Sequence, residues 1–229
     1  MAFSFINSTA LRIATSASTW SIPTHSSIQG GAGMVLGIGL ASSAVTVSAV
    51  ADNAGNAWQL AIARGTPKPA AGAELWYASN ISSASTRVSI TLSAGSSGGI
   101  ALGQWSGMST NNALLNTGSS AITANSTSHS ASEITPSSAN ALVVSFARLT
   151  ASSIGNVSIL GGMTSWCSTA QELSSRSVGL YIIQGAGSTA TGSFTTSSNA
   201  QHAAVIAAFS DTQAASAGLW ASMLCLGVQ

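Results

Sequence analysis

Two glycine-rich segments match the letters of known catalytic or binding patterns. Residues 95–99, Gly-Ser-Ser-Gly-Gly, match the nucleophile elbow. That elbow needs a helix after the serine, and later Asp and His partners. A strand-like segment follows instead, so we predict a glycine-rich hairpin loop. Residues 185–190 resemble a dinucleotide fingerprint, but the next segment is again strand-like. It offers no helix N-terminus to a pyrophosphate, so we predict a turn.

Ionisable side chains are few and scattered. His25, His129 and His202 are far apart, and none has a partner at metal-ligand spacing. No two acids are close enough in sequence to indicate paired-carboxylate chemistry. We therefore predict no enzymatic activity, no metal site and no cofactor. The five carboxylates are Asp52, Glu74, Glu133, Glu172 and Asp211.

The two cysteines, Cys167 and Cys225, do not form a disulfide framework. Two isolated thiols in a chain of this length are more typical of free cysteines, although a pair between them stays open.

The tryptophans are the largest side chains in a chain made mostly of small residues. In strands such rings usually belong to the core. Trp76 and Tyr77 are adjacent, so their side chains point to opposite faces of a sheet. One of them must cover a neighbouring strand, fill a subunit interface or stack on a sugar. The alternative function, a carbohydrate-binding or adhesin module, would use Trp76, Trp105 and Trp166 as exposed stacking platforms.

Composition excludes several classes of partner. Only 5% of the 229 residues are charged and the net charge is +1, against about 25% charged in an average domain. The basic residues are dispersed, so neither a nucleic acid nor a membrane surface finds a basic patch. The most apolar runs are about half the ~20 residues of a spanning helix. The N-terminus lacks the features of a signal peptide, so we expect synthesis in a cytoplasm.

Period-two alternation dominates the chain and is clearest between residues 45 and 107. Val45, Val47 and Ala49 alternate with polar residues, and Trp58, Leu60 and Ile62 do the same after an Asp/Asn/Gly turn. This pattern predicts a β-hairpin whose apolar residues share a buried face. About eleven such strands and negligible helix predict an all-β protein, an antiparallel β-sandwich of jelly-roll or Ig-like type.

The sequence divides into three parts. Residues 1–16 are an N-terminal arm or an edge strand, and residues 17–210 form the sandwich domain. Within it, residues 108–136 are predicted to be a long connection with one edge strand around 121–127.

Residues 211–229 form an apolar C-terminal tail. This tail either folds back as a further strand or docks on another subunit, and we expect the second because an exposed apolar tail is a liability. The residues expected to make that assembly contact are Leu219, Trp220, Met223, Leu224 and Leu226.

Four segments together carry a resemblance to a known class of module. They are residues 45–58 (VTVSAVADNAGNAW), 74–80 (ELWYASN), 87–92 (RVSITL) and 101–107 (ALGQWSG). Their order resembles a β-sandwich module of tailed-bacteriophage virion proteins and some bacterial surface proteins. The resemblance implies a sandwich displayed on a particle or cell surface, with no catalytic residues.

We therefore predict a structural protein of a phage virion, a capsid decoration or a tail or fibre component. Its partners would be copies of itself, other virion proteins and, in the alternative, a host-surface glycan.

Overall fold

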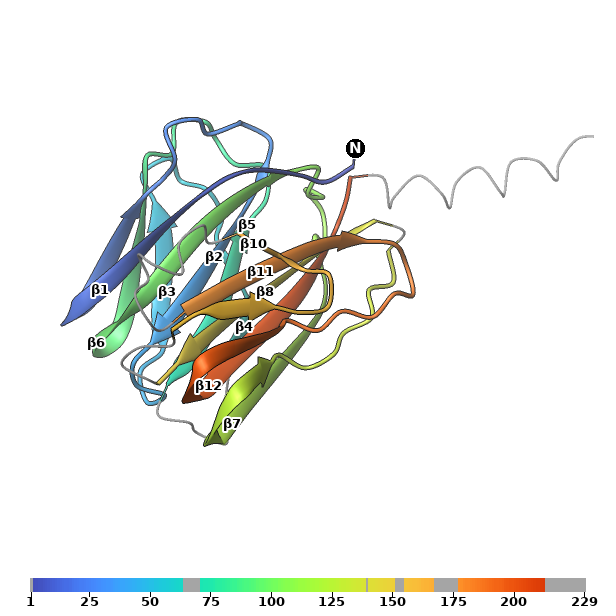
Figure 1. The fold of residues 1–229 in the computed structure, drawn as a ribbon. Helices are drawn as coiled ribbons and strands as arrows, with labels where there is room; N and C mark the ends of the chain where they lie inside the picture. The colour runs from blue at the N-terminus through green and yellow to red at the C-terminus, as the bar shows by residue number, and fades with distance from the viewer. Residues whose placement is uncertain (1, 64–70, 139, 151–154, 167–176, 213–229) are drawn as a thin grey trace, which may run out of the picture.

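Twelve β-strands in two antiparallel sheets make up the described part of the fold, which confirms the predicted all-β sandwich (Figure 1). The computed structural model describes residues 2–63, 71–138, 140–150, 155–166 and 177–212, and contains no helix within those ranges. The strands are β1 (Ser4–Pro23), β2 (Gly33–Leu40), β3 (Val47–Asp52), β4 (Gln59–Ala63), β5 (Gly72–Ala78), β6 (Arg87–Ser106), β7 (Leu114–Ser130), β8 (Ala141–Leu149), β9 (Val157–Ile159), β10 (Thr164–Ser165), β11 (Ser177–Gln184) and β12 (Ser193–Ser210).

The two sheets repeat one topology. The first has the order β1-β6-β2-β5-β4, with β3 also paired to β6. The second has the order β7-β12-β8-β11-β10, with β9 also paired to β12. Each strand of the second sheet therefore stands where the strand six earlier stands in the first. We call β1–β6 the first lobe and β7–β12 the second lobe.

The register of the two sheets also agrees. In each lobe a row of directly paired residues runs across four consecutive strands, from β5 to the edge strand β1 and from β11 to the edge strand β7, and passes through one tyrosine. The row in the first lobe is Tyr77, Val35, Gly103 and Ser8, and the row in the second is Tyr181, Val144, Ala207 and Thr117. These rows define equivalent positions in the two lobes.

The long strands β6 and β12 bend, and the bend gives each lobe its own core. Ile90 and Leu102 of β6 belong to one buried cluster, although the segment between them would span about 40 Å if it were straight. The bend lies at residues 95–99, which were predicted to be a hairpin loop and are instead the middle of β6. A Cβ at Gly98 would lie 2.0 Å from the Gly39 carbonyl oxygen, so only glycine fits at this close approach.

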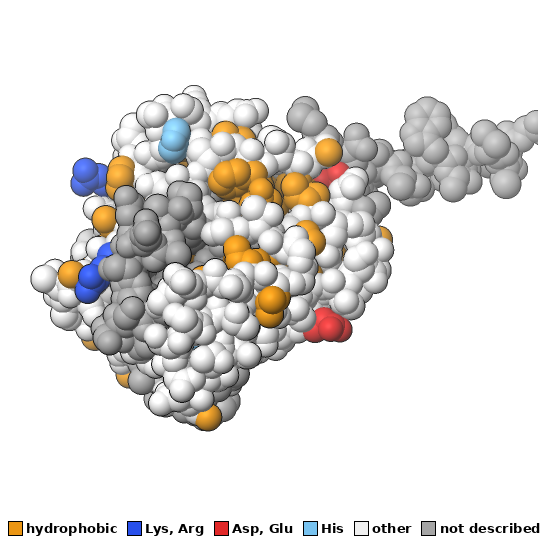
Figure 2. All heavy atoms as spheres, in the orientation of Figure 1, with side chains coloured by type: hydrophobic (Ala, Val, Ile, Leu, Met, Phe, Trp, Pro, Cys, Tyr) orange, Lys and Arg blue, Asp and Glu red, His pale blue; other side chains and the backbone are white. Residues whose placement is uncertain are grey.

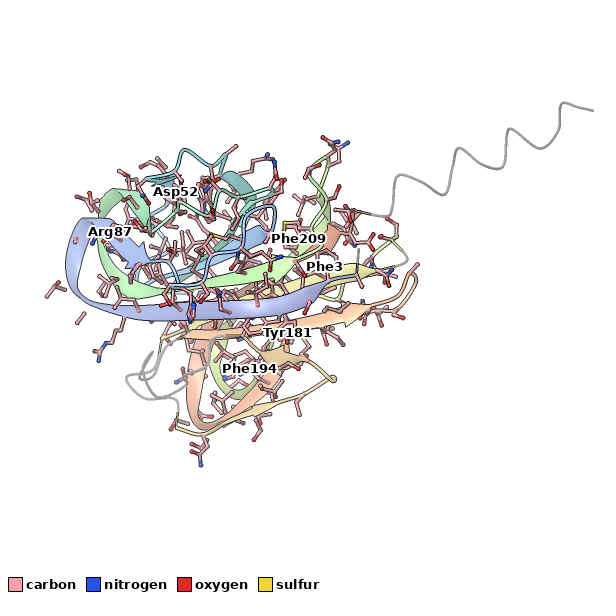
Figure 3. The ribbon with its side chains drawn as sticks, turned by 90° about the horizontal axis from the view of Figure 1, so that it is seen from above. Phe3, Asp52, Arg87, Tyr181, Phe194 and Phe209 are labelled. Atoms are coloured by element: carbon pink, nitrogen blue, oxygen red, sulfur yellow. The ribbon has the colours of Figure 1, made fainter. Side chains whose placement is uncertain are left out.

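A third core lies between the lobes and joins the two sheets. Tyr77 of the first lobe packs on Phe209 with ring centroids 5.2 Å apart, and Trp105 packs on Tyr181 at 5.8 Å. These two pairs are equivalent in the ladder registers, so an approximate two-fold axis relates the lobes. In Figure 3, Phe3, Phe209 and Tyr181 lie between the lobes, while Phe194 lies inside the second.

The predicted hairpin between residues 45 and 62 is wrong. β3 pairs with β6 and β4 pairs with β5, so the loop between them carries the chain from one part of the sheet to another. Leu60 is 46% exposed, whereas Ile62 packs against the core between the lobes. A register shift between these two residues places their side chains on different faces.

The two segments expected to be an arm or edge strand (residues 1–16) and a connection with one edge strand (residues 108–136) contain long edge strands. β1 runs from Ser4 to Pro23 without interruption at residue 16, and β7 covers residues 114–130 of the predicted connection. Neither strand shows strong apolar alternation, which is tolerated because an edge strand has a partner on one side only. The end of β12 reaches Asp211, which pairs with Met108. The tail residues 213–229 lie outside the described residues.

Candidate functional site

Ionisable side chains are few in this chain, as the sequence shows. No set of three or more His, Cys, Asp or Glu side chains comes together within those segments. No helix there is long and apolar enough to cross a membrane. Glu172, Cys167, Cys225 and the five tail residues named above fall outside the described part of the chain.

Asp52 organises the loop that follows β3. Its Oδ1 accepts hydrogen bonds from the Ala54 and Asn56 backbone N–H groups at 2.9 and 3.1 Å. Its Oδ2 accepts from Asn56 Nδ2 at 2.7 Å and from Trp58 Nε1 at 3.1 Å. Burial alone would raise the pKa of Asp52, but the four hydrogen bonds together outweigh it and lower the pKa. Such a carboxylate shapes a loop rather than transferring protons.

Asn53 and Asn56 connect that loop to the segment between β5 and β6. Asn53 Oδ1 accepts from the backbone N–H groups of Thr86 and Arg87 at 2.9 and 3.0 Å. Asn56 Oδ1 accepts from the Ser82 N–H at 2.8 Å. Asp52 and Arg87 accordingly lie together on the side of the first lobe away from the second (Figure 3).

Glu74 is a buried acceptor in β5, with a side chain only 4% exposed. Its Oε1 accepts from the Val47 N–H at 3.0 Å and its Oε2 from Trp76 Nε1 at 2.8 Å. Burial raises the pKa of Glu74, and the two hydrogen bonds oppose that rise. Both oxygens therefore hold β3 and a tryptophan in place within the first lobe.

The three tryptophans of the glycan-binding alternative occupy different environments. Trp105 and Trp166 are fully buried and pack edge to face with ring centroids 5.6 Å apart. Their faces are closed to a sugar, which corrects the expectation that they could be stacking platforms. Trp76 is half-buried, packs against the core of the first lobe and donates to Glu74. The alternative thus loses two of its three rings.

Two histidines come together that sequence spacing kept apart. His129 of β7 and His202 of β12 lie in the second lobe with their Nδ1 atoms 3.1 Å apart. Seventy-three residues separate them along the chain, and only the pairing of β7 with β12 brings them into contact. His25 remains exposed in the first lobe.

The strands β1 and β7 are the longest edge strands of the two sheets. Each stands at the end of its sheet's strand order. β1 is 20 residues long, and Arg12 is its one charged residue. β7 is 17 residues long and contains neither Pro nor a residue of the Asp, Glu, Lys or Arg type. Natural edge strands usually carry such residues because they prevent pairing with another chain.

The regular part of each edge strand is short and equivalent in the two lobes. Against β6, residues 7–13 of β1 keep an unbroken register, with shifts on either side. Against β12, residues 116–122 of β7 do the same. The segment after β7 contacts this part, because the Ser132 hydroxyl donates to the Ser119 carbonyl and Asn116 donates to the Thr135 carbonyl. β1 is contacted at the start of its regular part, where Asn7 Nδ2 donates to the Ser27 carbonyl at 3.0 Å.

The surface itself is nearly free of charge. The face in Figure 2 is dominated by uncharged polar side chains and backbone, with scattered hydrophobic side chains and few charged ones.

Comparison of the chain with protein-family models, with curated proteins and with solved structures gives no match.

Proposed function

We propose that the protein is a non-enzymatic structural protein of a phage particle, a capsid decoration or a tail or fibre component, that acts by subunit assembly. The edge of β1 over residues 7–13 carries the proposal, because it is regular and nearly without guarding charges. The particle itself is inferred from the resemblance of residues 45–107 to a virion module.

The chemistry of the surface supports assembly over catalysis. An edge strand offers a row of backbone N–H and C=O groups that another strand can pair with. An interface made of Ser, Thr, Ala and Asn removes few ions from water, so burying it against a neighbour has a small desolvation cost.

The partner of the β1 edge is the C-terminal segment of a neighbouring copy. That segment is rich in large apolar residues, and apolar burial contributes about 25 cal/mol per Å². It begins after Thr212, whose N–H donates to the carbonyl of Gly107, and Gly107 follows the residue that pairs with Ser4 at the start of β1. The tail of one copy and the edge of the next then form a head-to-tail contact.

Two exposed leucines of the first lobe give a matched test. Leu11 lies in the β1 edge and is 38% exposed, and Leu60 lies in β4 at the opposite edge and is 46% exposed. We expect Leu11→Lys to abolish concentration-dependent association in light scattering and Leu60→Lys to leave it unchanged. Thermal melting should show both variants folded.

Truncation after Thr212 tests the tail independently. We expect the same loss of association as for Leu11→Lys, an unchanged melt, and no incorporation into particles. Two results would contradict the proposal: a wild-type chain that stays monomeric at all concentrations, or a truncation that unfolds the chain. The second result would make the tail a strand of its own subunit.

A further inference from the structure

The paired histidines of the second lobe form an enclosed polar group inside an apolar core. His129 is 3% exposed and His202 is 0% exposed. Their rings are nearly perpendicular, at 81°, and Phe194 stacks on His129 with centroids 5.1 Å apart. The shortest contact between the histidines joins the two Nδ1 atoms at 3.1 Å.

The outer nitrogen of each ring faces a hydrogen-bond acceptor. His129 Nε2 lies 2.9 Å from Thr196 Oγ1, and the Thr196 hydroxyl donates its single hydrogen to the Ser198 carbonyl at 2.8 Å. In this arrangement of the Thr196 hydroxyl, Oγ1 accepts and His129 Nε2 carries a hydrogen. His202 Nε2 lies 3.1 Å from the Ser130 carbonyl, which can only accept. While the Ser120 hydroxyl donates to the same carbonyl, His202 Nε2 carries a hydrogen as well.

The hydrogen count exceeds what two neutral imidazoles contain. Each neutral ring has one N–H, so a neutral pair has two hydrogens. The contacts to Thr196 and Ser130 use both of them, and the contact between the Nδ1 atoms needs a third. We propose that His129 and His202 form a buried site for one proton, which the two Nδ1 atoms share.

Ser120 provides the route to the proton-free state. Its hydroxyl donates to the Ser130 carbonyl and lies 3.3 Å from His202 Nε2. When the pair loses one proton, the hydrogen on His202 Nε2 leaves, the Nδ1 hydrogen stays between the two rings, and Nε2 becomes an acceptor. The Ser120 hydroxyl then turns from Ser130 to His202, and the pair remains hydrogen-bonded in both states.

A proton fits this site better than a metal ion. Structural zinc is bound by four ligands and catalytic zinc by three protein ligands. Within the described segments, no third His, Cys, Asp or Glu joins the two rings. The two facing Nδ1 atoms are too few ligands for a metal ion but are enough to hold one shared proton.

Within the described ranges, the charged groups of the neighbouring elements face elsewhere. Arg148 of β8 directs its side chain to Gly39 in the first lobe, on the other side of the sheet. Glu133, which follows β7, is exposed. Burial first, and then the charge on His202, lower the pKa of His129 to about 4. The second proton therefore enters only in acid, where it places two N–H groups face to face and breaks the contact between the two histidines.

In the first lobe, the positions equivalent to the two histidines are occupied by residues that cannot bind a proton. Trp20 is equivalent to His129, and Gly98 is equivalent to His202. The Trp20 ring covers Gly98 so closely that a Cβ there would lie 2.7 Å from it. The double variant His129→Trp/His202→Gly transfers that apolar arrangement to the second lobe. The equivalence follows from the pairs Trp20–Ile90 and Gly98–Leu40 in the first lobe and His129–Phe194 and His202–Leu149 in the second.

Nitrogen-15 NMR of histidine-labelled full-length protein, titrated from pH 8 to pH 3 after chelator treatment, tests the site. We expect three hydrogens over the four ring nitrogens of His129 and His202 near neutral pH, and a fourth in acid. Two hydrogens, four hydrogens, or a ring-nitrogen signal that follows added zinc at neutral pH would each overturn the proposal.

Two conservative variants make the test independent of folding losses. Thr196→Val removes the acceptor of His129 at similar volume, so the count should fall to two, whereas Thr196→Ser should keep three. The double variant His129→Trp/His202→Gly should lose the acid transition of the melting temperature between pH 6.5 and 4. An unchanged count in Thr196→Val would show that the third hydrogen has another origin.

Discussion

The central strands β2 and β8 occupy equivalent places in the two lobes and also pack against each other, but their side chains differ in size. β2 presents Gly37 where β8 presents Phe146. The equivalence is set by register, because Gly37 pairs with Leu75 and Ala101, and Phe146 pairs with Gly179 and Val205. A Cβ at Gly37 would lie 2.4 Å from Phe146 Cδ2.

The difference follows from the approximate two-fold axis. On such an axis a position meets its own equivalent, so two phenylalanines would collide and two glycines would leave a cavity. Away from the axis the pairs can repeat, as Tyr77 with Phe209 and Tyr181 with Trp105 do. When a sheet packs on a repeat of itself, the two residues that meet on the axis must therefore differ in size.

The largest expected effect comes from exchanging these two residues. Phe146→Gly leaves a cavity between the lobes and should cost about 3 to 5 kcal/mol of unfolding free energy. Gly37→Phe inserts a second ring into occupied space and should destabilise at least as much. The double variant Gly37→Phe/Phe146→Gly should recover much of the loss, because it only reverses which lobe supplies the ring.

Urea unfolding of the four proteins in a double-mutant cycle measures this coupling. Additive losses in the double variant would mean that the two positions do not share one space. They would also remove the main support for asymmetry at the axis.

The sequence was enough to predict the fold class, but it did not indicate that the two lobes repeat one topology. Alternation of Val88, Ile90 and Leu92 was enough to predict a strand, because one face of it is buried. The bend at Gly98 has the same residue types as a hairpin loop, and only the approach of Gly39 distinguishes the two. Equivalent positions carry unlike residues, such as Trp20 and His129, so the lobes cannot be aligned by residue type.

The candidate sites were hidden for a related reason. Nothing near His129 in the sequence indicates His202, because their contact depends on which strands become neighbours. Trp105 and Trp166 belong to the core because both sheets contribute to their surroundings. Sequence alternation assigns a residue to a face but does not say whether another sheet covers that face.

Asp52 gives the next largest effect and tests the loop between β3 and β4 of the first lobe. Asp52→Asn replaces an accepting oxygen by an N–H donor, so it should lose the bonds to Asn56 or Trp58 at a cost of about 1 to 2 kcal/mol. The pKa of Asp52 is lowered on folding, so its contribution is present above the ordinary pKa of 3.8 and is lost as pH falls through the folded value.

Unfolding free energies from pH 7 to pH 2 provide the check. The wild-type and Asp52→Asn curves should converge in acid. Curves that stay a constant distance apart would show that the charge of Asp52 does not stabilise the loop.

Gly55 tests whether a glycine of this chain is required by its backbone conformation rather than by lack of space for a Cβ. Gly55 has φ +73°, and a Cβ placed on it would meet nothing within 4 Å, so conformation and not space requires glycine here. Gly55→Ala should cost about 1 kcal/mol. Gly30 is the matched control, because a Cβ there would make ordinary contacts at 3.7 Å and its φ is not positive. Gly30→Ala should be neutral or slightly stabilising in the same melts, and equal costs at both positions would contradict the distinction.

Glu74 gives the smallest effect at neutral pH and the most informative dependence on pH. The second lobe has Val178 at the equivalent position, so the fold itself does not need a carboxylate there. Glu74→Gln removes a buried charge, which stabilises, and loses one acceptor for Val47 or Trp76, which destabilises by about 1 kcal/mol. We expect the two effects nearly to cancel at pH 7.

The sign of the pH dependence distinguishes this balance from a simple absence of effect. Burial raises the pKa of Glu74 above its ordinary value of 4.5, so its contribution to stability is full below that value and is lost as pH rises through the folded pKa. Unfolding free energies from pH 4 to pH 8 should therefore shift in favour of Glu74→Gln as pH rises. If the Glu74→Gln curve is instead parallel to the wild-type curve, the pKa of Glu74 does not change on folding, and the first lobe differs from the second here in shape alone.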